Sequence, residues 1–160
     1  MSDKRESYKD VLQKIASTWQ QSPDPLARLT MVTGYLLERT DNIIFTAIFL
    51  LVDGELTVRS YNGPPARPVL EKHKGICWAC VDRGEPVVVA NVHEFPGYIR
   101  REGPSNSEVS VPIKTPAGGT IGVLHVDSAD FDAFDEVDVE YLVRIADLVS
   151  EVVAGTDLSR

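Results

Sequence analysis

The chain of 160 residues has a formal net charge of -8 and is 43% hydrophobic and 25% charged, which is ordinary for one globular domain. The negative charge repels phosphate backbones and anionic lipids, and no run of lysine and arginine offsets it, so we expect neither nucleic acid nor a membrane as a partner. The longest apolar run, residues 43–52, is about half of what spans a bilayer, and the N-terminus lacks a signal-peptide core, so we expect a cytoplasmic protein.

Two helices are predicted before the first strand, within about residues 5–40. Apolar residues at helical spacing indicate the first helix over about residues 5–21. Asp24 is a typical N-cap and Pro25 a typical first residue, so a second helix is expected to begin there. Both helices carry one apolar face and therefore need a sheet or another helix to cover it.

A strand hairpin is predicted next. Residues 43–52 are β-branched and aromatic with both alternate faces apolar, which indicates a strand covered on two sides. Asp53 and Gly54 then favour a tight turn into a second strand over residues 56–61.

The middle of the chain predicts a short helix, a strand and a long polar loop. Residues 75–83 read as a helix closed by Gly84, and residues 86–92 as an apolar strand. The loop covers residues 93–107 and contains glycine and proline.

Two strands and a long helix complete the chain. The strands cover residues 109–113 and 121–127, and the helix covers about residues 135–153. Terminal helices around a mostly antiparallel sheet predict an α+β fold with these helices on one face. We expect a single domain over residues 1–160, with the sheet and a pocket within about residues 43–128.

Four polar residues are predicted to gather on the face that the terminal helices leave open. If the connecting turn is centred on residues 117 and 118, Ser110 lies opposite His125 and Glu108 opposite Asp127. The alternate residues of both strands are apolar and face the helices. One face is therefore core, and the other is a candidate site.

Two facing carboxylates, Glu108 and Asp127, destabilise a sheet unless a proton or a cation lies between them. A ligand with an amino group would supply that cation. The alternative is that both carboxylates reach water near the strand ends and pair with Arg100 or Arg101. His125 either tunes the carboxylates and contacts an acidic ligand group, or has only a structural role.

Short motifs along nearly the whole chain resemble a GAF domain, and specifically its free methionine-(R)-sulfoxide reductase branch. They are residues 24–29 (DPLARL), 61–66 (YNGPPA), 75–77 (GIC), 91–99 (NVHEFPGYI), 107–112 (SEVSVP) and 121–128 (IGVLHVDS). The resemblance implies a GAF-type sheet with the N- and C-terminal helices on one face and a small ligand pocket on the other, lined in part by the loop 93–107.

The resemblance also assigns positions in that pocket. The acid pair that engages the substrate in the reductases corresponds to Glu108 and Asp127. A further family carboxylate corresponds to His125, and two pocket aromatics correspond to Phe45 and Phe49. We also expect Tyr98 and Arg101, both in the loop, to line the ligand site.

The reductases use three cysteines, and only Cys77 remains at those positions. Arg67 and Arg101 occupy the other two, the second being the catalytic one. A guanidinium keeps its proton and cannot attack sulfur. We therefore predict a small-molecule-binding or sensory signalling module without catalytic activity, metal or cofactor. Acidic and basic groups around one pocket favour an amino-acid-like ligand. The resemblance implies a homodimer, because GAF domains often associate through their first and last helices.

The alternative function is a methionine-(R)-sulfoxide reductase or related thiol oxidoreductase that uses Cys77 and Cys80. These residues have C-x-x-C spacing, and Cys77 lies near the start of the predicted short helix, where the helix dipole favours a thiolate. A zinc site formed by these cysteines with His73 and His93 is not expected, because the spacing matches no standard finger.

Overall fold

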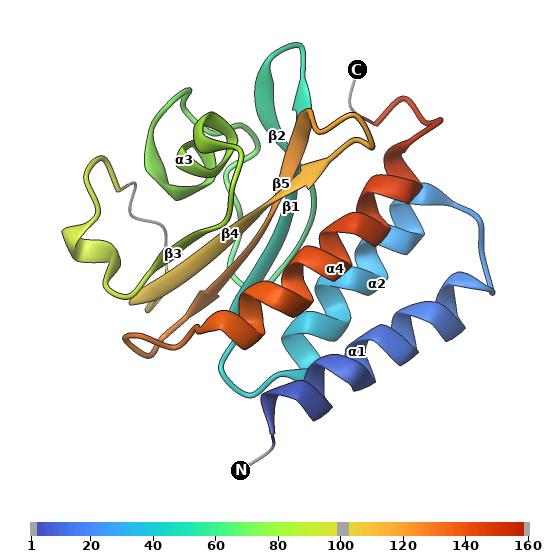
Figure 1. Cartoon of the computed structure of the whole chain (residues 1–160), viewed down its shortest axis with the longest axis horizontal. Coiled ribbons are helices and arrows are strands. Elements are labelled where there is room, and N and C mark those ends of the chain that lie inside the picture. Colours follow the sequence, from blue (N-terminus) through green and yellow to red (C-terminus); the bar gives the residue numbers. More distant parts are fainter. Residues whose placement is uncertain (1–2, 99–102, 159–160) are drawn as a thin grey trace.

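The computed structural model describes residues 3–98 and 103–158, and Figure 1 shows their arrangement. These residues form four α-helices and five strands in the order that the sequence predicts. In chain order they are α1 (Lys4–Trp19), α2 (Pro25–Arg39), β1 (Phe45–Val52), β2 (Glu55–Asn62), α3 (Gly75–Arg83), β3 (Val87–Val89), β4 (Ser107–Lys114), β5 (Thr120–Ser128) and α4 (Glu136–Val153). The α+β fold is confirmed.

Local signals fix several of these boundaries. The Asp24 carboxylate accepts a hydrogen bond from the backbone N–H of Ala27 at 2.9 Å, and α2 starts at Pro25. Gly84 closes α3 at a φ of 67°, a conformation that costs glycine little. Asp53 and Gly54 both have positive φ, 51° and 80°, as the tight turn between two twisted strands requires.

The strand predicted over residues 86–92 is shorter than expected. Only Val87–Val89 pairs with β4. Beyond it the Asn91 side chain accepts a hydrogen bond from the backbone N–H of His93 at 3.0 Å and starts the 3₁₀ turn η1 (Val92–Glu94). The chain therefore leaves the sheet and enters the loop earlier than its apolar residues suggest.

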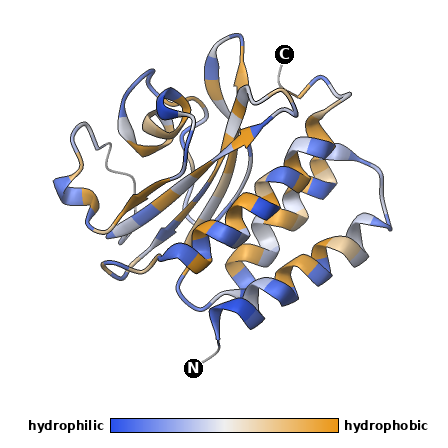
Figure 2. Ribbon diagram, in the orientation of Figure 1, coloured by the Kyte–Doolittle hydropathy of each residue, from blue (hydrophilic) through white to orange (hydrophobic). Residues whose placement is uncertain are grey.

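The strands form one antiparallel sheet in the order β2-β1-β5-β4-β3. Helices α1, α2 and α4 lie on one face and α3 lies on the other (Figure 1). Figure 2 shows the central strands as largely apolar. Gly122 of β5 allows close contact between β5 and β1, because a Cβ at this position would lie 2.3 Å from the backbone oxygen of Phe49 in β1.

Each face of the sheet has its own apolar core. The core under the three helices includes Val109, Val111, Leu124 and Val126, as the alternation predicts. The smaller core, on the other face, holds α3 against the sheet, and its members include Phe45, Phe49, Ile76, Cys77, Trp78 and Cys80. The candidate site lies on this second face.

A buried carboxylate ties α1 to the start of α4. Asp138 is 4% exposed and accepts hydrogen bonds from Lys4 at 2.6 Å and from the Tyr8 hydroxyl at 2.7 Å. Its other contact completes the capping box of α4 with Asp135. Over residues 3–98 and 103–158, none of the helices combines the length and the apolar character needed to cross a membrane.

Candidate functional site

The predicted pairing of β4 with β5 is confirmed: Glu108 lies opposite Asp127, and Ser110 lies opposite His125. A bulge between Ile113 and Lys114, close to the turn, leaves this pairing unchanged. All four side chains are buried, with exposures of 3%, 3%, 0% and 2% in the same order. The part of the alternative in which the two carboxylates reach water is therefore wrong, whereas their pairing with Arg100 or Arg101 lies outside the described residues.

His125 lies between the two carboxylates. Its Nε2 atom is 2.6 Å from an Asp127 oxygen and 3.2 Å from a Glu108 oxygen. Burial lowers the pKa of His125, but the Cys77 sulfur and the Asp127 carboxylate raise it more, so the pKa lies well above its ordinary value of 6.5. The chain thus supplies a cation of its own at the place where we expected a ligand's amino group.

The other nitrogen of His125 begins a hydrogen-bonded connection to Cys77. Nδ1 is 2.6 Å from the Ser110 hydroxyl oxygen, and that hydroxyl donates to the Cys77 sulfur at 3.6 Å. When the imidazole is charged, His125 Nδ1 donates to the Ser110 hydroxyl, and that hydroxyl in turn donates to the Cys77 sulfur. Three elements of the chain, α3, β4 and β5, contribute to it.

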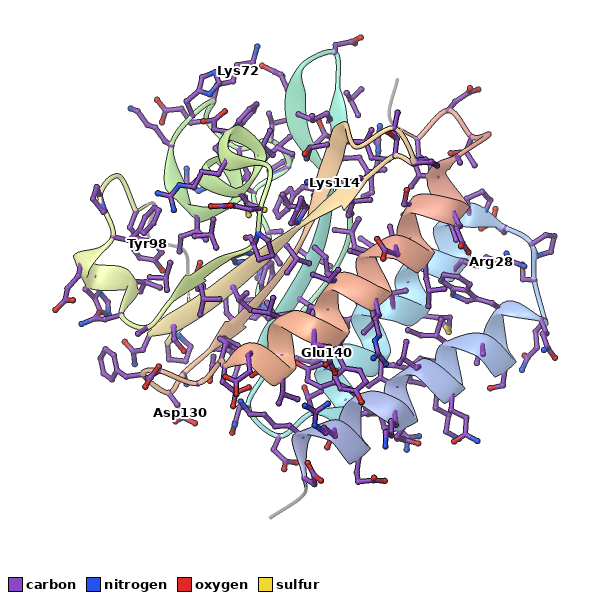
Figure 3. All side chains as sticks on the ribbon, viewed as in Figure 1. Arg28, Lys72, Tyr98, Lys114, Asp130 and Glu140 are labelled. Atoms are coloured by element: carbon purple, nitrogen blue, oxygen red, sulfur yellow. The ribbon has the colours of Figure 1, made fainter. Side chains whose placement is uncertain are left out.

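Glu108 is also held from the loop side. Its second carboxylate oxygen accepts hydrogen bonds from the Tyr98 hydroxyl at 3.1 Å and from the Ser105 hydroxyl at 2.7 Å. In Figure 3, Tyr98 lies on the α3 side of the sheet, whereas Glu140 marks α4 on the opposite side. Tyr98 therefore contacts the cluster through Glu108, and its contact with a ligand stays a prediction.

These side chains border a recess beside the start of α3. Its walls are formed by Phe49, Arg67, Leu70, Lys74, Gly75, Ile76, Cys77, Tyr98, Glu108 and His125. The recess with its open mouth measures about 430 Å³, but only about 40 Å³ is accessible to the centres of water-sized molecules. A ligand larger than a few waters must therefore extend into the mouth.

Of the remaining predicted residues, Phe45 and Asp127 do not border this recess. Phe45 and Asp127 border a second, smaller recess together with Pro64 and Ser105. The Phe45 ring nonetheless packs edge-on against the His125 ring, 6.3 Å away between centroids, so the two recesses meet at the ionic cluster. Arg101, expected in the pocket, lies outside the described residues.

Arg67, Lys74 and Ser105 were not assigned to the ligand site from the sequence. Arg67 could have been found, because it directly follows the motif at residues 61–66. Lys74 and Ser105 gave no signal, since a lysine before a helix and a serine in a polar loop are common on any surface.

The two cysteines differ strongly although both are free thiols. Cys77 is 7% exposed and borders the recess. Cys80 is 0% exposed and does not border it, and burial raises the pKa of Cys80 to about 12. Cys80 therefore stays a protonated thiol at neutral pH.

Glu108, His125 and Asp127 offer donor atoms within 4.8 Å of one another, a spacing that also suits a metal ion. However, a metal would have to displace the proton that joins His125 to the carboxylates. We therefore interpret this group as an ion-pair cluster. His73 and His93 are exposed; His73 contacts Asp82, and His93, in the turn η1, contacts Asn106.

The described residues thus combine an antiparallel sheet, three helices on one face of it, and a recess on the other face. The family model of the GAF domain matches residues 22–154, and the chain belongs to this family. Helix α1 lies outside the matched span.

Relatives of known name cover nearly the whole chain. GAF domain-containing protein A of Dictyostelium discoideum is 34% identical, covering 91% of this chain and 92% of its own. The free methionine-R-sulfoxide reductase of Escherichia coli is 28% identical over 99% and 95%. The solved structure of free methionine-R-sulfoxide reductase from Neisseria meningitidis, in complex with its substrate, superposes with a TM-score of 0.87 at 30% identity, covering 95% and 91%.

Proposed function

We propose that this GAF domain is a sensory module that binds a small amino-acid-like zwitterion in the recess beside α3. Charges of both signs at one recess support the proposal. Arg67 and Lys74 border the recess with positive charges, and Glu108 borders it with a negative charge. Phe49 and Leu70 between them offer apolar surface for a side chain.

The charges are distributed so that each end of a zwitterion finds a partner. Glu108 borders the recess as well as the ion pair with His125, so its carboxylate is the group that an ammonium in the recess can approach. Arg67 is exposed and presents a guanidinium fork, which suits a carboxylate. The ammonium is thus expected toward Glu108 and the carboxylate toward Arg67.

Sulfoxide reduction is not expected from this site. By the resemblance to the reductases, Arg67 stands where they have a cysteine, and a guanidinium provides neither a nucleophile nor a resolving thiol. Binding without turnover is therefore the proposed function.

The binding proposal is tested by calorimetric titration with free methionine, methionine sulfoxide and other amino acids. Removing the charge of Glu108 with Glu108→Gln is expected to weaken binding by tenfold or more, because a charge-assisted hydrogen bond contributes about 1.5–3 kcal/mol. Glu151→Gln removes the same charge from an exposed position of α4 and serves as the matched control. Equal affinities in the two variants would contradict the proposal.

A second candidate function is free methionine-(R)-sulfoxide reduction, because Cys77 borders the recess and the named relatives include reductases. Consumption of NADPH with thioredoxin and methionine sulfoxide, lost in Cys77→Ser, would establish it and overturn the non-catalytic proposal. The expected homodimer and cytoplasmic location stay predictions. Static light scattering of the purified chain tests the first.

A further inference from the structure

Cys77 is placed where a cysteine becomes a nucleophile. The row of contacts runs from the Asp127 carboxylate to His125 at 2.6 Å, from His125 to Ser110 at 2.6 Å, and from Ser110 to the Cys77 sulfur at 3.6 Å. A carboxylate, a histidine and a thiol are also the groups that activate cysteine nucleophiles, and here Ser110 connects the histidine to the thiol. Ser110 donates to the sulfur, which is the hydrogen bond that a thiolate accepts.

The start of α3 adds to this environment. Cys77 is the third residue of a nine-residue helix, and Lys74 at the N-cap makes no side-chain capping bond. The partial positive charge of the helix N-terminus thus faces the same recess that Gly75, Ile76 and Cys77 border. A helix N-terminus and a neighbouring imidazolium are two features that stabilise thiolates in proteins.

Access to Cys77 is limited to small molecules. The residue is only 7% exposed, and it is reached through the recess beside Arg67 and Tyr98. Cys80, one helical turn further, is fully buried. A reagent that enters the recess therefore meets one thiol, and the second is not available to displace what the first has bound.

We propose that Cys77 is a modification site that forms a mixed disulfide with low-molecular-weight disulfides that enter the recess. The Cys77 thiolate attacks one sulfur of the disulfide, a new S–S bond forms, and the original S–S bond breaks. The leaving thiolate takes up a proton from water. No further oxidant is needed, because the small disulfide oxidises Cys77: one of its halves leaves as a thiol and the other stays bound to the Cys77 sulfur.

The adduct is expected to persist until an external thiol removes it. Cys80 stays protonated and buried, so it does not attack the mixed disulfide from within the chain. The bound half occupies the recess, and a covalently modified chain is therefore expected to bind the zwitterionic ligand poorly. Covalent modification would thus switch off the binding proposed above, although the reaction itself does not depend on that binding.

The test follows the mass of the intact chain during incubation with bis(2-hydroxyethyl) disulfide, a small neutral disulfide. At about pH 7, the folded Cys80→Ser variant is expected to gain one half of the reagent about tenfold faster than the same variant unfolded in urea. The reaction rate of N-acetylcysteine, measured with and without urea, corrects for the effect of urea on the exchange reaction itself. Cys77→Ser is expected to show no addition while folded. His125→Gln is expected to react at least about tenfold more slowly than the wild type.

Each outcome decides the proposal. A folded Cys77 that reacts no faster than the unfolded one, or addition at Cys80 instead, overturns it. If His125→Gln does not fold, the comparison of folded with unfolded Cys80→Ser still decides. Because the reagent is neutral, its reaction is independent of the zwitterion proposal, which calorimetry on Cys77→Ser tests separately.

Discussion

Replacing His125 with glutamine removes the cation that lies between two buried carboxylates. The Nε2 atom is 2.6 Å from Asp127 and 3.2 Å from Glu108, and both carboxylates are 3% exposed. Breaking a buried ion pair by removing one partner costs about 3–5 kcal/mol, because the remaining charge stays desolvated. Most domains have a free energy of unfolding of about 5–15 kcal/mol, so the loss should be large but measurable.

The free energy of unfolding of the His125→Gln variant should depend on pH with a definite sign. Without the cation, one of the two facing carboxylates is expected to hold a proton in the folded chain, with a pKa above its unfolded value. Such a group contributes stability at low pH that is lost as the pH rises through its folded-state pKa. The free energy of unfolding of His125→Gln should therefore be higher at about pH 5 than at about pH 8.

The wild type follows the same rule for a different reason. Burial lowers the pKa of His125, but Cys77 and Asp127 raise it above 6.5. The stability contributed by the charged imidazole is therefore complete below pH 6.5 and is lost as the pH rises through the folded-state pKa.

The assay is urea denaturation followed by tryptophan fluorescence at both pH values. The matched control is the double variant Glu108→Gln with His125→Gln, which removes one negative charge together with the cation. It is expected to recover most of the lost free energy, and the double-mutant cycle isolates the interaction. The reasoning would be refuted by a loss below about 1 kcal/mol that the double variant does not change, with a free energy of unfolding of His125→Gln no higher at about pH 5 than at about pH 8.

Three further predictions concern the sheet, the loop and α4. Gly122→Ala should lower the free energy of unfolding by about 1–3 kcal/mol or more, because the new Cβ would lie 2.3 Å from the Phe49 backbone oxygen. Urea denaturation measures this loss, and Gly119→Ala is the control, because a Cβ there would lie 3.6 Å from its nearest neighbour, the Thr115 hydroxyl oxygen. Tyr98→Phe removes the donor 3.1 Å from Glu108, so calorimetry should show ligand binding weakened about fivefold, whereas an unchanged affinity would place the ligand elsewhere. Asp135→Ala removes the cap of α4 and should cost about 1 kcal/mol at neutral pH. Burial raises the pKa of Asp135, but the hydrogen bond from the Val137 amide and the charge of Lys4 lower it more, so that it lies below 3.8. The cost of Asp135→Ala should therefore vanish as the pH falls through that lowered pKa. A cost that persists in strong acid would argue against the cap.

Much of the fold was predictable because its signals are local. Asp24 with Pro25, Asp53 with Gly54, and Gly84 each mark a boundary through the backbone conformation of a few neighbouring residues. The end of β3 was less predictable, since Asn91 starts a 3₁₀ turn inside an apolar stretch. Strand length depends on whether a partner strand is present, which local residue types do not encode.

Part of the candidate site was also predictable, because a two-residue period and one turn position fix which side chains of β4 and β5 face each other. This placed Glu108 opposite Asp127 and Ser110 opposite His125. The division of the aromatic positions was not predictable: Phe49 borders the main recess, whereas Phe45 borders the second one. That division depends on how the loops fold over the sheet.

The sequence by itself determined the family, the order of the elements and the face on which the polar residues gather, because motifs and periodicity are properties of neighbouring residues. Only the tertiary structure decided that His125 supplies the cation between the carboxylates and that Ser110 connects it to Cys77. Those contacts join α3 to strands more than 30 positions away, and their distances are set by the packing of the core between them. Chain spacing cannot specify an atomic distance across such a separation, whereas a packed core fixes it.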